Sequence, residues 1–137
     1  MRRVFREVLL LALLALGPAL VSGAVQLKWR TSPAPREGEV SVALARQWGV
    51  KVLWVDARAR AKFERKSIAG AVPLNVEEWE TRVAKFLDEW DPDKAVVVYG
   101  DGSGDNAVEV AHRLKEELKL DGIWVLQGGW DEWTRHP

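Results

Sequence analysis

The 137-residue sequence contains no cysteine, and this absence excludes more chemistry than any other feature of the composition. Without cysteine there is no disulfide bond, no thiolate metal site, no lipid-modified cysteine and no thiol nucleophile. Histidine is also scarce, with two residues in the whole chain. Every mechanism that depends on a cysteine is therefore excluded before any motif is considered.

The charges show no excess of either sign, since 20 Lys and Arg residues balance 20 Asp and Glu residues. A nucleic-acid-binding domain needs a strongly basic face, so we expect no nucleic-acid partner. Apolar residues make up 47% of the chain and charged residues 29%, as in globular domains and unlike disordered chains. A chain of this length forms one domain of ordinary size but not two.

The first 24 residues have the pattern of a targeting or anchoring segment. An uninterrupted apolar run at 8–16 is followed by small residues and preceded by three basic residues, Arg2, Arg3 and Arg6. This order is typical of a secretory signal peptide. An uncleaved membrane anchor remains open, because residues 8–25 are just long enough to span a bilayer.

In either case we expect the folded part to lie outside the cytoplasm, as an exported periplasmic domain or one anchored in the inner membrane by residues 8–25. Residues 25–38 are polar and contain Pro33 and Pro35, so we interpret them as a linker. Residues 39–137 are expected to form a single domain. Contact with a membrane would then occur only through the N-terminal segment.

Segments of strand and helix character alternate through the predicted domain. The expected strands are runs of β-forming residues at 50–55, 71–74, 95–99 and 123–126. The expected helices follow Ser41, Ala59, Asn75, Asp105 and Gly128, and we interpret Ser41, Asn75 and Asp105 as N-caps. This alternation predicts an α/β domain with a mainly parallel sheet. Ligands of such sheets bind beyond the carboxyl ends of strands, which points to the loops after Val55 and Tyr99.

Three segments in these regions resemble the signatures of the rhodanese-like sulfurtransferase family. Asp56-Ala57-Arg58 is similar to its Asp-x-Arg motif, and a Val-rich strand ending at Tyr99 leads into the six-residue loop 100–105. Leu126-Gln127-Gly128-Gly129-Trp130 is similar to its Leu-x-Gly-Gly-Trp motif. The resemblance implies one rhodanese-like α/β domain, with a mainly parallel five-stranded sheet and helices on both faces.

The sequence departs from the family at the residue that carries its chemistry. Family members transfer sulfane sulfur through a cysteine persulfide, and the corresponding position here is Gly100, which has no atom that could form one. The loop position that is often arginine is Asp105. The resemblance therefore implies a catalytically inactive member that acts as a binding or scaffold module. A sulfurtransferase-related or hydrolytic enzyme with a non-cysteine mechanism remains the alternative.

The candidate ligand loop consists of Gly100, Asp101, Gly102, Ser103, Gly104 and Asp105. Its two carboxylates are expected to oppose the binding of small oxyanions by the loop backbone. Asp56 and Arg58 either belong to the site or form an internal ion pair that stiffens the loops. We expect no catalytic residue, no metal and no cofactor, because Ser103 has only His112 as a nearby base and the loop lacks a dinucleotide fingerprint.

The partner of such a module is expected to be a protein, which the sequence does not identify. Tryptophan is the most abundant aromatic residue, with eight copies, and most of these side chains are expected to fill the core and its rim. A solvent-facing tryptophan would instead mark a binding surface, and the residues to examine are Trp79, Trp90, Trp130 and Trp133.

Overall fold

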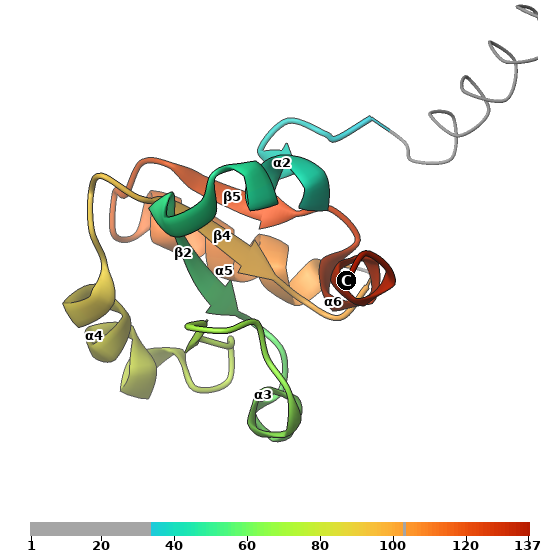
Figure 1. Cartoon of the computed structure of the whole chain (residues 1–137). Coiled ribbons are helices and arrows are strands. Elements are labelled where there is room, and N and C mark those ends of the chain that lie inside the picture. The colour runs from blue at the N-terminus through green and yellow to red at the C-terminus, as the bar shows by residue number, and fades with distance from the viewer. Residues whose placement is uncertain (1–33, 103) are drawn as a thin grey trace, which may run out of the picture. The chain divides into compact units, whose positions relative to one another are not determined.

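The computed structural model describes residues 34–102 and 104–137 (Figure 1). The predicted targeting segment, most of the predicted linker and Ser103 lie outside the described residues, so the expectations about them stay predictions. Within the described part of the chain, no helix is long and apolar enough to cross a membrane.

Five strands form one parallel sheet in the order β1-β5-β4-β2-β3. Their bounds are Glu39–Val40, Val52–Asp56, Val72–Pro73, Ala95–Tyr99 and Ile123–Leu126 for β1 to β5. The α/β prediction is confirmed, and every pairing in the sheet is parallel. The sequence did not reveal β1, because a two-residue strand has no detectable period.

Helices cover both faces of this sheet, as expected (Figure 1). The helices are α2 Val42–Gln47, α3 Arg60–Arg65, α4 Trp79–Glu89, α5 Asp105–Glu116 and α6 Gly129–Arg135, with a 3₁₀ turn at Gly49–Lys51. Apolar residues of α4 and α5 pack on one face, and those of α2 and α6 pack on the other. The sheet is therefore the middle of three layers.

Strand β4 lies at the centre of the sheet and is buried from both sides. Val96 and Val98 belong to the core under α4 and α5, whereas Val97 and Tyr99 belong to the core under α2 and α6. This double burial explains why the strand is an unbroken run of β-forming residues. It also brings the loop that follows Tyr99 to the carboxyl edge of the sheet.

The helix caps agree with the sequence at one position and differ at two. Ser41 Oγ accepts a hydrogen bond from the Leu44 amide at 3.2 Å and caps α2 as predicted. Asn75 accepts one from the Glu78 amide at 2.7 Å, but it closes a turn before α4 rather than the helix itself. Asp105 is the first helical residue of α5, and the predicted cap there is wrong because Gly104, at φ 81°, occupies that position.

Candidate functional site

A buried ion pair stands at the carboxyl end of β2. The Arg58 Nη2 atom lies 2.8 Å from Asp56 Oδ2, and the two side chains are 3% and 0% exposed. The Arg58 Nε atom and backbone amide also donate to Asp56, at 2.9 to 3.2 Å. The structure thus shows the internal ion pair, and whether the two residues also belong to a site stays a prediction. A carboxylate so fully bonded holds both residues in one conformation.

Tyr99, at the end of β4, links this pair to the neighbouring segment. Its hydroxyl donates to Asp56 Oδ2 at 2.8 Å and accepts from the Ile68 amide at 3.1 Å. Arg58 Nη2 donates to the Lys66 carbonyl at 2.6 Å. The pair and the phenol therefore tie the chain after α3 to the ends of two strands. Sequence reasoning did not assign Tyr99 this role.

Burial raises the pKa of the Tyr99 phenol above its ordinary value, and the neighbouring Asp56 carboxylate adds to the rise. In the unfolded chain the phenol ionises near its ordinary pKa of about 10. The folded state keeps the proton to higher pH, so the free energy of unfolding is expected to fall above about pH 10, by about 1.4 kcal/mol per pH unit.

This expectation can be measured directly, because Tyr99 is the only tyrosine of the chain. The ultraviolet absorbance of phenolate should appear together with unfolding, and Tyr99→Phe should remove this part of the alkaline destabilisation. A reversible phenolate signal from the native protein near the unfolded pKa would contradict the expectation.

The loop between β4 and α5 is held in place by the start of α6. The Trp130 amide donates to the Gly100 carbonyl at 2.8 Å, and the Asp131 amide donates to the Asp101 carbonyl at 3.1 Å. A Cβ at Gly129 would lie 2.6 Å from the same Gly100 oxygen. Two of the segments singled out in the sequence, 100–105 and 126–130, are thus in direct backbone contact, and Gly129 permits that approach.

Gly100 itself is not required by the backbone. Its φ lies outside the left-handed region, in contrast to Gly104 and Gly129. A Cβ at this position would lie 3.5 Å from the Ala107 Cβ and 3.6 Å from the Ala107 amide nitrogen, which are ordinary contacts. A Cβ fits here without a clash, so the backbone at this position does not require glycine.

Carboxylates surround the loop, but not in the arrangement that the sequence suggested. Asp101 Oδ1 is bonded to Lys62 Nζ at 2.8 Å, so a cation of α3 offsets its charge. The Asp131 side chain packs against the loop, where a Cβ at Gly102 would collide with its carboxylate. Asp105 is exposed at the start of α5. Sequence reasoning missed Lys62 and Asp131, which lie far along the chain from the loop.

A hollow of about 400 Å³ opens beside the loop. Its lining residues come from α3, the two neighbouring loops and α6, and they are Arg58, Lys62, Arg65, Lys66, Asp101, Trp130 and Asp131. The Arg58 guanidinium lies over the Trp130 ring, 4.1 Å from its centroid, and forms one wall. Residues 34–102 and 104–137 contain no group of three or more His, Asp or Glu side chains able to hold a metal ion.

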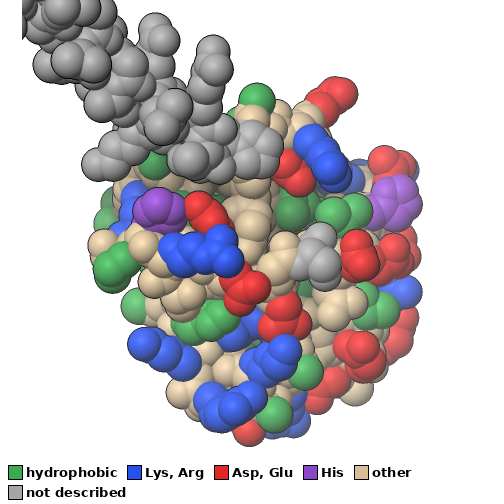
Figure 2. Space-filling model, turned by 90° about the vertical axis from the view of Figure 1, so that its right-hand side faces the viewer, with side chains coloured by type: hydrophobic (Ala, Val, Ile, Leu, Met, Phe, Trp, Pro, Cys, Tyr) green, Lys and Arg blue, Asp and Glu red, His purple; other side chains and the backbone are tan. Residues whose placement is uncertain are grey.

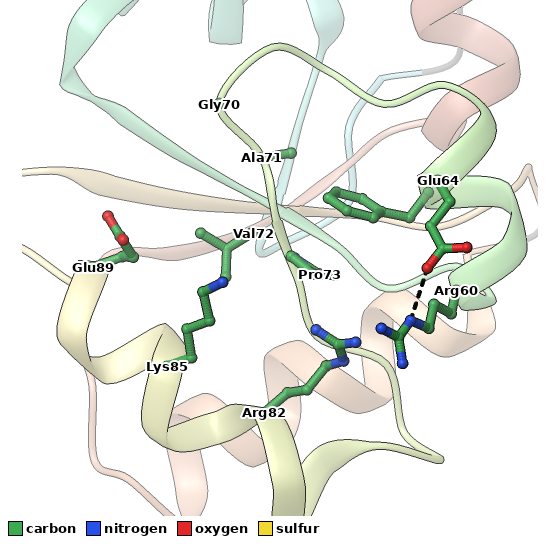
Figure 3. Close-up of a pocket in the computed structure, with 10 residues that line it drawn as sticks. Arg60, Glu64, Gly70, Ala71, Val72, Pro73, Arg82, Lys85 and Glu89 are labelled. Carbon is green, nitrogen blue, oxygen red and sulfur yellow. Dashed lines mark hydrogen bonds and ion pairs between the residues drawn. The ribbon is translucent and has the colours of Figure 1, made fainter.

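A second hollow, of about 360 Å³, lies between β3, α3 and α4 (Figure 3). Its arginines are matched by acidic partners, because Arg60 bonds Glu64 at 2.9 Å and Arg82 bonds Glu78 at 2.8 Å. Lys85 points across the hollow toward Val72 in the same view. None of its lining residues belongs to the loop after β4.

The tryptophan side chains of the described residues pack inward, as the composition suggested. Trp79 is buried, whereas Trp90, Trp130 and Trp133 are half-buried. On the α2 and α6 side the rings touch one another, with centroids 5.0 Å apart for Trp54 and Trp133. The described part of the chain therefore presents no fully exposed tryptophan that would mark a binding surface.

A family model and several solved structures of known proteins are similar to this chain. The family model described as a rhodanese-like domain matches residues 39–136. No curated protein matches the sequence. Among solved structures, a human single-domain sulfurtransferase is 20% identical with a TM-score of 0.61, and the alignment covers 73% of this chain and 97% of that one.

Two further structures show the same similarity. A rhodanese-related protein from Thermoplasma volcanium is 18% identical with a TM-score of 0.57, over 71% of this chain and 90% of that one. The 3-mercaptopyruvate sulfotransferase SseA from Escherichia coli is 20% identical with a TM-score of 0.57, over 72% of this chain and 47% of that one. At these identities the likeness establishes the fold.

Proposed function

Because this chain belongs to the rhodanese-like domain family, whose sulfur transfer depends on a cysteine thiolate, we propose that it is a catalytically inactive member acting as a binding or scaffold module. The observation that carries the proposal is Gly100 at the nucleophile position in a chain without cysteine. The buried Asp56–Arg58 pair and the contacts between loop and α6 support it, because they preserve a rigid, shaped surface without the reactive group.

The purified protein is expected to transfer no sulfur from thiosulfate to cyanide and to gain no sulfur atom in mass after thiosulfate treatment. The reason is that no side chain of the sequence can form a persulfide. Thiocyanate production is measured against a mock preparation, and the intact mass is recorded. Turnover that scales with the protein would overturn the proposal and favour the non-cysteine enzyme.

Gly100→Cys provides the matched control for that assay. Since a Cβ is accommodated at this position, the variant is expected to fold, and labelling with a thiol reagent measures the accessibility of its single thiol. An added sulfur mass on this variant, absent from the parent chain, would show that the assay detects persulfide when a thiol is present. A parent chain that gains the same mass would contradict the proposed inactivity.

We place the module outside the cytoplasm, exported or held in the inner membrane by residues 8–25, on the strength of the basic and apolar pattern of residues 1–24. A fusion of residues 1–40 to a reporter that is active only outside the cytoplasm is expected to give a signal. A silent reporter with protein in the cytoplasm would contradict export. The size of the mature product distinguishes a cleaved signal from an uncleaved anchor.

A further inference from the structure

Helix α3 differs from the other α-helices of the described residues, because none of its side chains belongs to, or packs against, either apolar core. It is also rich in cations: residues 60–66 include one acidic residue, Glu64, and four basic ones, Arg60, Lys62, Arg65 and Lys66. Lys and Arg side chains gather in the lower part of Figure 2, at the height where α3 lies in Figure 1. The side chains of this helix therefore contribute positive charge to the surface and do not add to the apolar core.

The internal contacts of the domain use only part of this charge. Arg60 pairs with Glu64 and Glu78, and Lys62 pairs with Asp101. Arg65 and Lys66 form no ion pair within residues 34–102 and 104–137. Lys66 follows the last residue of α3, where the backbone is already extended at φ −163°. The charges of Arg65 and Lys66 are thus not used by an ion pair within the described residues and can meet an external anion.

Three of these cations converge on the hollow beside the loop. Lys62, Arg65 and Lys66 line it, and only Lys62 is paired there, with Asp101 Oδ1 2.8 Å from its Nζ atom. That pair is open to solvent, with side chains 44% and 45% exposed. Exposed ion pairs are weak, so another carboxylate can replace Asp101 at Lys62. Asp101 then acts as an internal competitor for an acidic ligand.

We propose that this cationic surface, formed by Lys62, Arg65 and Lys66, binds an acidic segment of a partner protein through its Asp and Glu carboxylates. The inference rests on the proposed function, for which it names the class of partner. The hollow also contains the carboxylates of Asp101 and Asp131, which repel an anionic ligand. The flexible Asp and Glu side chains of a peptide can reach the cations while avoiding these two carboxylates. A sheet of anionic lipid headgroups would meet the same two carboxylates with less freedom to avoid them.

The test uses the full-length protein in detergent and a fluorescently labelled oligoglutamate peptide, with anisotropy as the readout, at an ionic strength of about 0.1 M, where the Debye length is about 10 Å. Arg65→Ala together with Lys66→Ala is expected to weaken binding about tenfold, the loss expected of two exposed ion pairs. The control is Lys85→Ala with Lys115→Ala, two exposed lysines that line other hollows. It removes the same charge and should leave the affinity within about twofold, since distant exposed charges are screened.

A second pair of variants tests the competition. Asp101→Asn frees Lys62 and is expected to strengthen peptide binding about threefold, whereas Asp105→Asn, with the same change of charge but no contact with Lys62, should have little effect. Equal effects in the two members of either comparison would mean unspecific attraction and would overturn the inference, as would the absence of peptide binding.

Two further arms separate other anions from a peptide. Phosphatidylglycerol mixed into the detergent micelles that displaces the peptide more than phosphatidylcholine does, and through the same residues, would replace the protein partner by a membrane. Displacement of the peptide by sulfate beyond the effect of chloride at equal ionic strength would indicate a small-anion site instead. If the peptide-binding test fails, the proposal that the protein is catalytically inactive is unaffected, because sulfur transfer is measured in a separate assay.

Discussion

Arg58→Ala is expected to lower the free energy of unfolding by about 3–5 kcal/mol, the typical cost of removing one partner of a buried ion pair. The substitution leaves the Asp56 carboxylate, which is 0% exposed, without its guanidinium. The hydrogen bonds from the Tyr99 hydroxyl and the residue 58 amide remain, but they carry no compensating charge. The Trp130 ring also loses the cation that covers it.

Urea unfolding followed by tryptophan fluorescence measures this loss. Arg58→Lys keeps the charge but loses the forked geometry of the guanidinium, so its stability should lie between those of the parent and the alanine variant. Arg60→Ala removes surface pairs with Glu64, where the side chains are 56% and 61% exposed, and with Glu78, and it should cost no more than about 1 kcal/mol. A similar loss for Arg58→Ala and Arg60→Ala would contradict the structural role given to the buried pair.

Gly129→Ala is expected to destabilise the domain by about 2–4 kcal/mol, through a left-handed backbone and a steric clash. The residue has φ +54°, and the new Cβ would lie 2.6 Å from the Gly100 carbonyl oxygen and 2.8 Å from that of Asp101. Both neighbours are backbone atoms, which cannot move without breaking the contact between the loop and α6.

Gly49→Ala is a closely matched control, because its φ is +55° and nothing lies within 4 Å of the added Cβ. It should cost only the left-handed backbone, about 1–2 kcal/mol, and the difference between the two variants isolates the steric part. Urea unfolding of both proteins gives that difference. If Gly129→Ala were no more destabilising than Gly49→Ala, the loop and α6 would not be in the close contact described.

The two substitutions, at Arg58 and Gly129, affect the segments around Gly100, the position at which the family has its nucleophile. The buried pair positions the chain after α3, and Gly129 positions the loop after β4. The segments that they position border the hollow beside the cationic surface, through Lys66 after α3 and Asp101 after β4. We therefore expect the framework to be needed for partner binding even though the domain has no thiol chemistry to support.

Much of the fold could be predicted from the sequence. The central strand at 95–99 and the strand at 123–126 have the predicted bounds, because buried runs of β-branched residues between turn residues are a strong local signal. The alternation of strands and helices determined the α/β class, and the missing cysteine determined the inactivity now proposed, since neither depends on three-dimensional contacts.

Only the tertiary structure determined which distant segments of the chain are in contact. Strand β1 exists because its two residues pair with β5, and it has no period of its own. The bonds of Tyr99 to Asp56, of Lys62 to Asp101 and of the α6 amides to the loop each join residues from different elements. Such contacts follow from the order of the strands and the path of each crossover, which local periodicity does not contain. The same reason explains why Asp131, rather than Asp105, proved to be the second carboxylate that packs against the loop.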